Sequence, residues 1–280
     1  MDFAEIRRTV IIAMFSDDLL MDLVVLKGGN ALSIVHRVGG RTSLDVDFSI
    51  PEDFADLDDV RRRIERALAD RFDSAGYRVF DFSFQRRPRD PNRRDDRWGG
   101  YRIEFKLLPV ARASIAATNL ALAQRSALEI GPGQTRVFCI EISKYEYCDQ
   151  KVAVLVDGYE IFVYPLFLLA AEKLRALCQQ MPEHTGRRKV TARARDFYDI
   201  HAILTSPDYR QPMDFATVVN KVFAAKEVAL NLLLLLRTTR EFHRSDWPAV
   251  LNSVSVPVES FDFYFDFVVR WADSVKSLSG

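Results

Sequence analysis

One short stretch of the sequence constrains the fold more than any other. Between positions 43 and 50 polar and apolar residues alternate strictly. The apolar set is Leu44, Val46, Phe48 and Ile50, and the polar set is Ser43, Asp45, Asp47 and Ser49. Because successive side chains of a strand point to opposite faces, this pattern predicts a strand with one buried face. The other face then presents the carboxylates of Asp45 and Asp47, close enough together to share divalent cations.

A glycine pair precedes this strand. The sequence Lys27-Gly28-Gly29-Asn30 follows a short apolar run, 24–26, which predicts a strand, and leads into a predicted helix over 31–37. Glycine lets the backbone approach a phosphate closely, and the free N–H groups at the start of a helix attract anions. The alternative interpretation is an ordinary glycine turn that ends a strand.

The predicted secondary structure changes near Tyr164, from mixed helices and strands to helices alone. Before it, periodicity predicts helices over 3–23, with a break near Ser16, over 57–72 and over 113–124. The predicted strands there span 77–84, 101–107 and 137–143, and residues 151–163 predict one or two short strands around a turn at Asp157-Gly158. After it, the predicted helices span 165–180, 193–204, 215–237 and 261–278. The sequence therefore predicts an α+β fold, in which a mixed-sheet domain over residues 1–164 is followed by a helical domain over residues 165–280.

Composition excludes several classes of protein. The 39 Lys and Arg residues balance 39 Asp and Glu residues, so any nucleic-acid contact must be a local patch on a neutral protein. The three cysteines include no CxxC pair, which predicts no disulfide framework and favours a reducing cytosol. No secretory signal is visible, and the most apolar run, 228–236, is shorter than the roughly 20 residues of a membrane span. We expect a cytoplasmic protein that does not use a membrane.

Two arginine-rich segments are candidates for a local basic patch. Residues 85–100 hold Arg86, Arg87, Arg89, Arg93, Arg94 and Arg97 among prolines and aspartates, and predict a hairpin with a long, mobile tip. Residues 186–189, with Arg193 and Arg195, form the second cluster. Such clusters bind phosphate, or they are solvated loops balanced by neighbouring acidic residues.

Other conspicuous residues predict structure rather than chemistry. The four histidines lack HExxH-like or CxxC-linked spacing, so we interpret each as a packing or surface residue. The aromatic run 261–267 is interpreted as part of the core, because ring-bearing stripes in a terminal element are usually buried.

Four segments, taken in chain order, carry a resemblance to a known family. The first joins 27–32 (KGGNAL) to 41–48 (RTSLDVDF); the others are 138–143 (FCIEIS) with Glu146, 171–177 (AEKLRAL), and 193–200, which contains an RDxYD segment. Together they resemble the motifs of the AbiEii/AbiGii-type nucleotidyltransferase toxins, members of the polymerase-β-like nucleotidyltransferase superfamily. The resemblance spans roughly Leu26 to Leu204, and implies that superfamily's fold for the mixed-sheet domain.

The resemblance also implies roles for individual residues. Asp45, Asp47 and Glu141 would hold Mg²⁺ or Mn²⁺ on a nucleoside triphosphate, with Glu141 also activating or positioning the nucleophile. The implied nucleotide-binding residues are Lys27, Gly28, Gly29, Asn30, Arg41, Ser43 and Asp199. The helical domain would contribute Lys173, which neutralises charge on the nucleotide, and Asp196, which with Asp199 completes the site or positions Lys173.

Two positions depart from this pattern or leave it open. Asn30 stands where the wider superfamily has Ser, although an amide can also donate a hydrogen bond to phosphate. Glu104, in the predicted strand 101–107, competes with Glu141 as the third carboxylate, because alternation alone does not say which of them faces Asp45. The family match favours Glu141.

The implied function is that of a metal-dependent nucleotidyltransferase, the toxin of a toxin–antitoxin system of the phage-defence type. It would transfer a nucleoside monophosphate from a triphosphate to RNA, such as the 3′ end of tRNA, and release pyrophosphate. A separately encoded antitoxin would be its partner. The alternatives are transfer to a protein or small-molecule hydroxyl, and a catalytically silent module that binds nucleotide, because fold alone does not identify the acceptor.

Overall fold

The computed structural model describes residues 1–280 except 42, 44, 89–98, 131–134, 185–189, 255, 279 and 280. It divides into two compact units. The first unit comprises Met1–Asn30 and Ser43–Val163, and the second comprises Ala31–Thr42 and Tyr164–Gly280. Residues 31–42, which the sequence analysis assigned to the first domain, therefore group with the helical unit.

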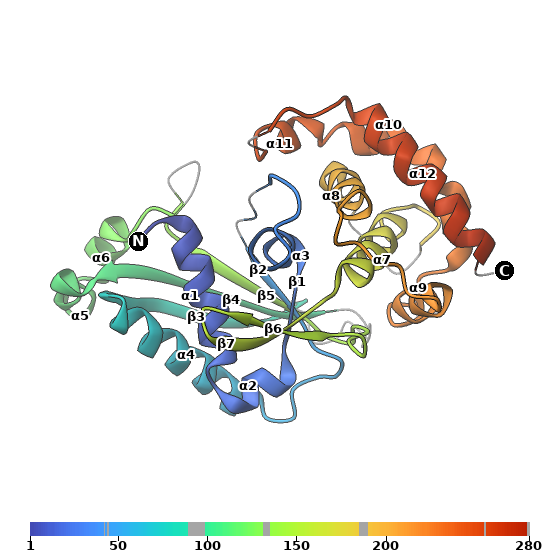
Figure 1. The fold of residues 1–280 in the computed structure, drawn as a ribbon. Helices are drawn as coiled ribbons and strands as arrows, with labels where there is room; N and C mark the ends of the chain where they lie inside the picture. Colours follow the sequence, from blue (N-terminus) through green and yellow to red (C-terminus); the bar gives the residue numbers. More distant parts are fainter. Residues whose placement is uncertain are drawn as a thin grey trace. The chain divides into compact units, whose positions relative to one another are not determined.

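Within the described residues, the first unit contains a seven-stranded mixed sheet in the order β3-β4-β5-β2-β1-β7-β6 (Figure 1). The strands are β1 (Val25–Lys27), β2 (Val46–Ser49), β3 (Tyr77–Arg87), β4 (Gly100–Pro109), β5 (Phe138–Ser143), β6 (Val152–Val156) and β7 (Tyr159–Val163). Strand β2 is parallel to β5 and antiparallel to β1, and β1 is parallel to β7. The remaining neighbours are antiparallel.

Two helices, α1 (Phe3–Phe15) and α4 (Leu57–Ser74), cover one face of this sheet. The buried ring of Phe48 in β2 packs against Phe15 of α1, and that of Phe105 in β4 packs against Phe72 of α4. Val46 lies on the same face as Phe48 and is fully buried. The predicted strand is thus confirmed over Val46–Ser49, with Asp47 on the face opposite Val46 and Phe48. The prediction was too long, because Asp45 lies in a bend before the strand, and Ser49 is completely buried instead of exposed.

The shorter helices of the first unit are α2 (Asp18–Leu23), α3 (Gly28–Asn30), α5 (Ser114–Thr118) and α6 (Leu120–Ser126). The predicted break near Ser16 is confirmed, because the Asp17 carboxylate accepts from the Leu20 N–H and starts α2. The prediction of one helix over 113–124 is wrong, because Asn119 caps a new helix by accepting from the Leu122 N–H.

The arginine-rich hairpin is only partly described. Strand β3 continues through Arg87, so Arg86 and Arg87 are strand residues and not loop residues as predicted. The other four arginines of the predicted tip lie in 89–98, outside the described residues. The second basic cluster, 186–189, also lies outside them.

The second unit is helical (Figure 1). Its elements are a π-helix (Ala31–Val35), α7 (Leu166–Cys178), α8 (Ala194–Leu204), α9 (Phe215–Ala224), a 3₁₀-helix (Leu230–Thr239), α10 (Arg240–Arg244), α11 (Trp247–Leu251) and α12 (Phe261–Leu278). The prediction of one helix over 215–237 is wrong. Glu227 has a φ of 53°, in the left-handed region that ends a helix, and tighter 3₁₀ turns follow it.

Helix α12 carries the aromatic run. Phe261, Tyr264 and Phe265 are buried, and Phe197 of α8 packs against Phe261 and Phe265, which confirms the interpretation of this run as core. Phe263 is the exception and remains 45% exposed. No helix among the described residues is both long enough and apolar enough to cross a membrane.

Candidate active site

The first unit presents a row of charged residues on the sheet face opposite α1 and α4. In the sheet register, Asp47 of β2 is flanked by Lys27 of β1 and Glu141 of β5, and Glu141 lies opposite Arg102 of β4. Residues directly opposite each other on neighbouring strands point to the same face. The register therefore brings these four residues into one row across four strands.

Asp45 lies at the bend just before β2, two residues before Asp47, and its side chain is exposed. The electrostatics of Cys139 in β5 locate it more closely. Burial raises the pKa of the Cys139 thiol, and the negative charges of Asp45, Glu141 and Glu104 raise it further, against the opposing effect of Arg102. Asp45, Glu141 and Glu104 therefore all lie close enough to the Cys139 thiol to act on it.

The register distinguishes the two candidates for the third carboxylate. Glu141 lies on β5, the immediate neighbour of β2, whereas Glu104 lies on β4, one strand further away. Arg102 joins them, with its Nη1 2.8 Å from Glu141 Oε1 and its Nε 2.7 Å from Glu104 Oε1. Glu141 is therefore the glutamate beside Asp47, and Glu104 holds the arginine that binds Glu141.

Gly28 is required by its contact with Asp47. Its φ of 69° lies in the left-handed region, and a Cβ at this position would overlap Oδ2 of the Asp47 carboxylate. Only glycine satisfies both conditions without strain. The sequence suggested Gly28 as a site of close approach to a phosphate. The structure adds a second reason for glycine at this position, which is the space that the Asp47 carboxylate occupies.

The other side chains of the first unit that were predicted to bind nucleotide make protein contacts. Lys27 Nζ lies 3.3 Å from Glu146 Oε1, and both side chains are buried. The Asn30 side chain is completely buried and donates from Nδ2 to the Asp45 carbonyl at 2.6 Å. Ser43 Oγ donates to the same carbonyl at 3.4 Å. These contacts organise the backbone and charges around the two aspartates.

The chemistry of the acidic face suits a hard divalent cation. Carboxylate oxygens are the ligands that Mg²⁺ and Mn²⁺ prefer, and Asp47 in β2 and Asp45 in the bend before it offer two carboxylates two residues apart. Glu141 is bound to Arg102, and no three acidic, histidine or cysteine side chains among the described residues meet as a ready three-ligand group. The donor set fits a cation through the aspartate pair, with Glu141 on the adjacent strand.

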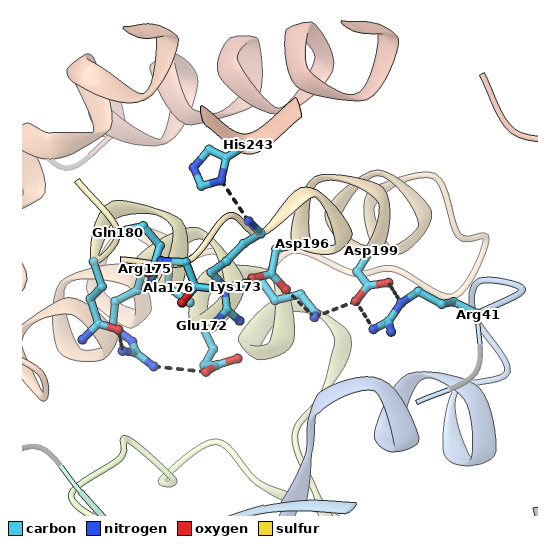
Figure 2. A network of polar contacts seen from close by, with 12 residues as sticks. Arg41, Glu172, Lys173, Arg175, Ala176, Gln180, Asp196, Asp199 and His243 are labelled. Atoms are coloured by element: carbon cyan, nitrogen blue, oxygen red, sulfur yellow. Dashed lines mark hydrogen bonds and ion pairs between the residues drawn. The ribbon is translucent and has the colours of Figure 1, made fainter. Parts of the chain in front are cut away.

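The second unit contains a chain of ion pairs that joins α7 and α8 to the segment 31–42 (Figure 2). Lys173 Nζ of α7 lies 3.0 Å from Asp196 Oδ1 and 2.7 Å from Asp199 Oδ2, both on α8. Asp199 also accepts hydrogen bonds from Arg41 Nε at 3.2 Å and Nη2 at 2.9 Å. Asp196 in turn pairs with Arg193, which is only half-buried.

Each buried member of this network stays charged. Burial by itself would lower the pKa of Lys173, but Asp196 and Asp199 outweigh it and raise that pKa. Burial would raise the pKa of Asp196, but Arg193 and Lys173 hold it well below the usual range. The pKa of Asp199 is lowered in the same way, by Arg41 and Lys173. Mutual pairing is what makes these buried charges tolerable.

The structure thus brings together four residues that sequence reasoning selected separately, Arg41, Lys173, Asp196 and Asp199. Arg195, four residues before Asp199 on α8, is exposed, and Asp199 instead binds Arg41 and Lys173. Arg41 and Asp199 are 158 residues apart, so no local sequence pattern predicts that they pair.

Sequence reasoning missed three residues that support these clusters, Arg7, Arg102 and His243. Arg102 shares a strand face with Glu104, which alternation alone would have revealed. His243 is fully buried against Phe197, and its Nδ1 accepts from the Arg193 N–H at 3.0 Å. Its interpretation as a packing residue is confirmed, whereas nothing in the local sequence marks its bond to Arg193.

Comparison with known proteins adds one informative match. The family model described as "Nucleotidyl transferase AbiEii toxin, Type IV TA system" matches residues 10–267. A search of curated proteins gave no significant match.

Three solved structures are similar to this chain. A candidate nucleotidyltransferase from H. pylori is 12% identical over 99% of this chain and 94% of that one, with a TM-score of 0.49. JHP933 from Helicobacter pylori is 14% identical over 98% and 90%, with a TM-score of 0.47. An antigenic nucleotidyltransferase-like protein from Paracoccidioides brasiliensis is 15% identical over 80% and 93%, with a TM-score of 0.39.

The buried ion network predicts a large effect of Asp199→Asn. This change removes the carboxylate that pairs with both Arg41 and Lys173, and breaking a buried pair costs about 3–5 kcal/mol. We expect the free energy of unfolding of the helical unit to fall by about that amount in urea titrations. The matched control is Asp208→Asn, an exposed carboxylate just after the same helix, which should change it by less than about 0.5 kcal/mol. Equal stability of the two variants would contradict the role given to the network.

His243 predicts a pH dependence of stability. Burial lowers its pKa to about 4, from an ordinary value of 6.5, so the unfolded chain binds the proton more tightly than the folded one. The stabilising contribution is complete above pH 6.5 and is lost as the pH falls toward 4, by roughly 3 kcal/mol. His243→Asn keeps an acceptor for Arg193 but does not titrate. The stability difference between wild type and this variant should therefore change between pH 7 and pH 4, and a constant difference would contradict the assignment.

Proposed function

Because the chain belongs to the AbiEii nucleotidyltransferase toxin family, whose model matches residues 10–267, we propose that it transfers a nucleoside monophosphate to an RNA acceptor. Family membership makes it a nucleotidyltransferase that uses a nucleoside triphosphate, and the toxin of a type IV toxin–antitoxin system with an antitoxin as partner. The observation that carries the proposal is the pairing of Asp47 with Glu141, which is 46% exposed on the adjacent strand, together with the exposed Asp45 just before β2.

Asp45 and Asp47, with Glu141 as the third carboxylate, would hold Mg²⁺ or Mn²⁺. Bound cations of this kind neutralise charge on the triphosphate and on the leaving pyrophosphate. Glu141 would orient the attacking hydroxyl and take its proton. The oxygen of that hydroxyl forms a bond to the α-phosphorus, the bond from the α-phosphorus to the bridging oxygen breaks, and pyrophosphate leaves with the electron pair.

The helical unit is proposed to take part in the same reaction. Lys173 would supply a permanent positive charge, and the raised pKa of its ammonium group supports this role. Asp196 and Asp199 would position Lys173, as their distances of 3.0 and 2.7 Å from Nζ support. Gly28 and Gly29 would let the backbone approach the phosphates.

RNA is the acceptor we propose, with the 3′ end of tRNA as the first candidate. The protein is neutral overall, so phosphate contacts require a local basic surface, and the two arginine-rich segments supply the residues for one. Arg86 and Arg195, the exposed members within the described residues, are consistent with such contacts. A protein or small-molecule hydroxyl is the other acceptor class. A catalytically silent module is disfavoured by the intact row of carboxylates.

We expect Asp47→Asn to abolish transfer. The change keeps the shape of the side chain but removes the charge that a cation requires, so kcat should fall by more than the roughly 10- to 100-fold typical of changes beside a metal site. The purified protein is incubated with total bacterial RNA, Mg²⁺ and each α-labelled nucleoside triphosphate in turn, and labelled species are resolved on a denaturing gel. The wild type should label bands of tRNA size, and the variant should not.

The control for this assay is Glu52→Gln, which removes an exposed carboxylate from the same unit. Full activity of Asp47→Asn would refute the assigned site. Label that enters protein or a small molecule but not RNA would overturn the acceptor and keep the enzyme. If the wild type binds nucleotide but transfers no label to any acceptor, the catalytically silent module is favoured.

A second pair of variants identifies the third carboxylate. Because Glu141 is on the strand next to β2, Glu141→Gln should lower kcat by at least tenfold at saturating Mg²⁺. Glu104→Gln should retain most of the activity, since Glu104 lies one strand further away and contacts Arg102. The same assay measures both, and the reverse order of effects would assign the role to Glu104.

A further inference from the structure

The chain leaves the first unit after Asn30 and returns to it at Ser43, just before Asp45. Side chains hold these two points together. Asn30 Nδ2 donates to the Asp45 carbonyl at 2.6 Å, and Arg7 Nη1 donates both to Asn30 Oδ1 at 3.0 Å and to the Ser43 carbonyl at 3.3 Å. Because β2 begins only at Val46, strand pairing does not fix Asp45, and these side-chain bonds act where the ladder is absent.

Arg7 is unusual for a residue near the start of a helix, because its side chain is buried and only 7% of the residue is exposed. The guanidinium donates to uncharged oxygens, those of Asn30, Ser43 and, through Nε at 3.4 Å, Phe3. It also lies over the Phe3 ring at 4.8 Å. Burial lowers its pKa, with Asp2 opposing. Burying a cation among neutral groups is unfavourable unless hydrogen bonds compensate for the lost solvation. The hydrogen bonds of Arg7 are therefore expected to have a structural role.

The chemistry of Asn30 matches a bridge between these groups. An amide carries an acceptor oxygen and a donor nitrogen on the same carbon, pointing in different directions within one plane, so it can accept from Arg7 and donate to the Asp45 carbonyl at once. Serine has the hydroxyl of a phosphate ligand but is too short to span both partners. The complete burial of Asn30 is also unlike that of a side chain that meets a ligand.

We propose that Arg7, Asn30 and the Asp45 carbonyl form a clamp that sets the position of the aspartate pair. Arg7 and Asn30 are positioning residues, and Asn30 does not contact phosphate. The inference rests on the proposed function, because it assigns Asp45 to a bound cation. The clamp itself is a property of the protein alone, and is measurable in the absence of any cation.

The test compares Arg7→Met, Asn30→Ser and the double variant with wild type, and Arg8→Met is the matched control. Arg8 is the next residue of α1, is 49% exposed and pairs with Asp157. Hydrogen exchange without metal is measured at the amides of Ser43, Asp45 and Val46. The dissociation constant for Mn²⁺ is measured by electron paramagnetic resonance. Protected amides in β5 verify that each variant is folded. If Arg7→Met does not fold, Arg7→Lys replaces it in the comparison.

If the clamp exists, both single variants exchange faster at 43–46 and bind Mn²⁺ about tenfold more weakly, as expected for groups that position metal ligands. The double variant is no worse than either single variant, because both changes break the same chain of bonds. Arg8→Met matches wild type, and Arg7→Lys recovers part of the affinity.

If Asn30 is instead a phosphate ligand, Asn30→Ser keeps Mn²⁺ affinity and slow exchange, and Arg7→Met has no effect. That result overturns the clamp while Mn²⁺ binding by the wild type keeps the proposed function. Failure of the wild type to bind Mn²⁺, with faster exchange in both variants, overturns the cation site and the functional purpose of the clamp together. The two failures are thus distinguished by the wild type alone.

Discussion

The structure depends on the burial of one face of strand β2. Val46 and Phe48 are completely buried, and Phe48 packs against Phe15 of α1. The pleat then forces Asp47 to the opposite face, where burial of its charge is not demanded. A shift of one residue in the register would exchange the two faces, so the hydrophobic contact that stabilises the sheet also determines where the carboxylates lie.

Local patterns predicted this strand and most of the sheet because the information lies within a few residues. The alternation over 43–50 and the turn at Asp157-Gly158 between β6 and β7 are of this kind. Single residues that interrupt a pattern were harder to predict. Asn119 splits one predicted helix by its capping bond, and Glu227 ends another through a left-handed backbone conformation. Apolar periodicity continues through both positions and does not register the interruption.

The contacts of the candidate site were predictable as residue types but not as partners. Resemblance selected Arg41, Lys173 and Asp199 from separate motifs, yet no local rule pairs residues that are 158 or 26 positions apart. Only packing of α7, α8 and the segment 31–42 in one unit brings them together. Once buried, their charges must pair, because an isolated charge in such a place is far more costly than a matched set.

The glycine-rich motif shows that the type of a residue can be predicted from the sequence when its role cannot. Its residues were selected as a phosphate cradle, but in the structure Gly28 and Asn30 also have tasks within the protein. Gly28 makes room for the Asp47 carboxylate, and Asn30 bonds to the Asp45 carbonyl. Arg41, which precedes the aspartates in the same motif, anchors residues 31–42 to Asp199 of α8. One short segment thus holds two aspartates and enters two structural units, and each of these demands acts on a different side chain.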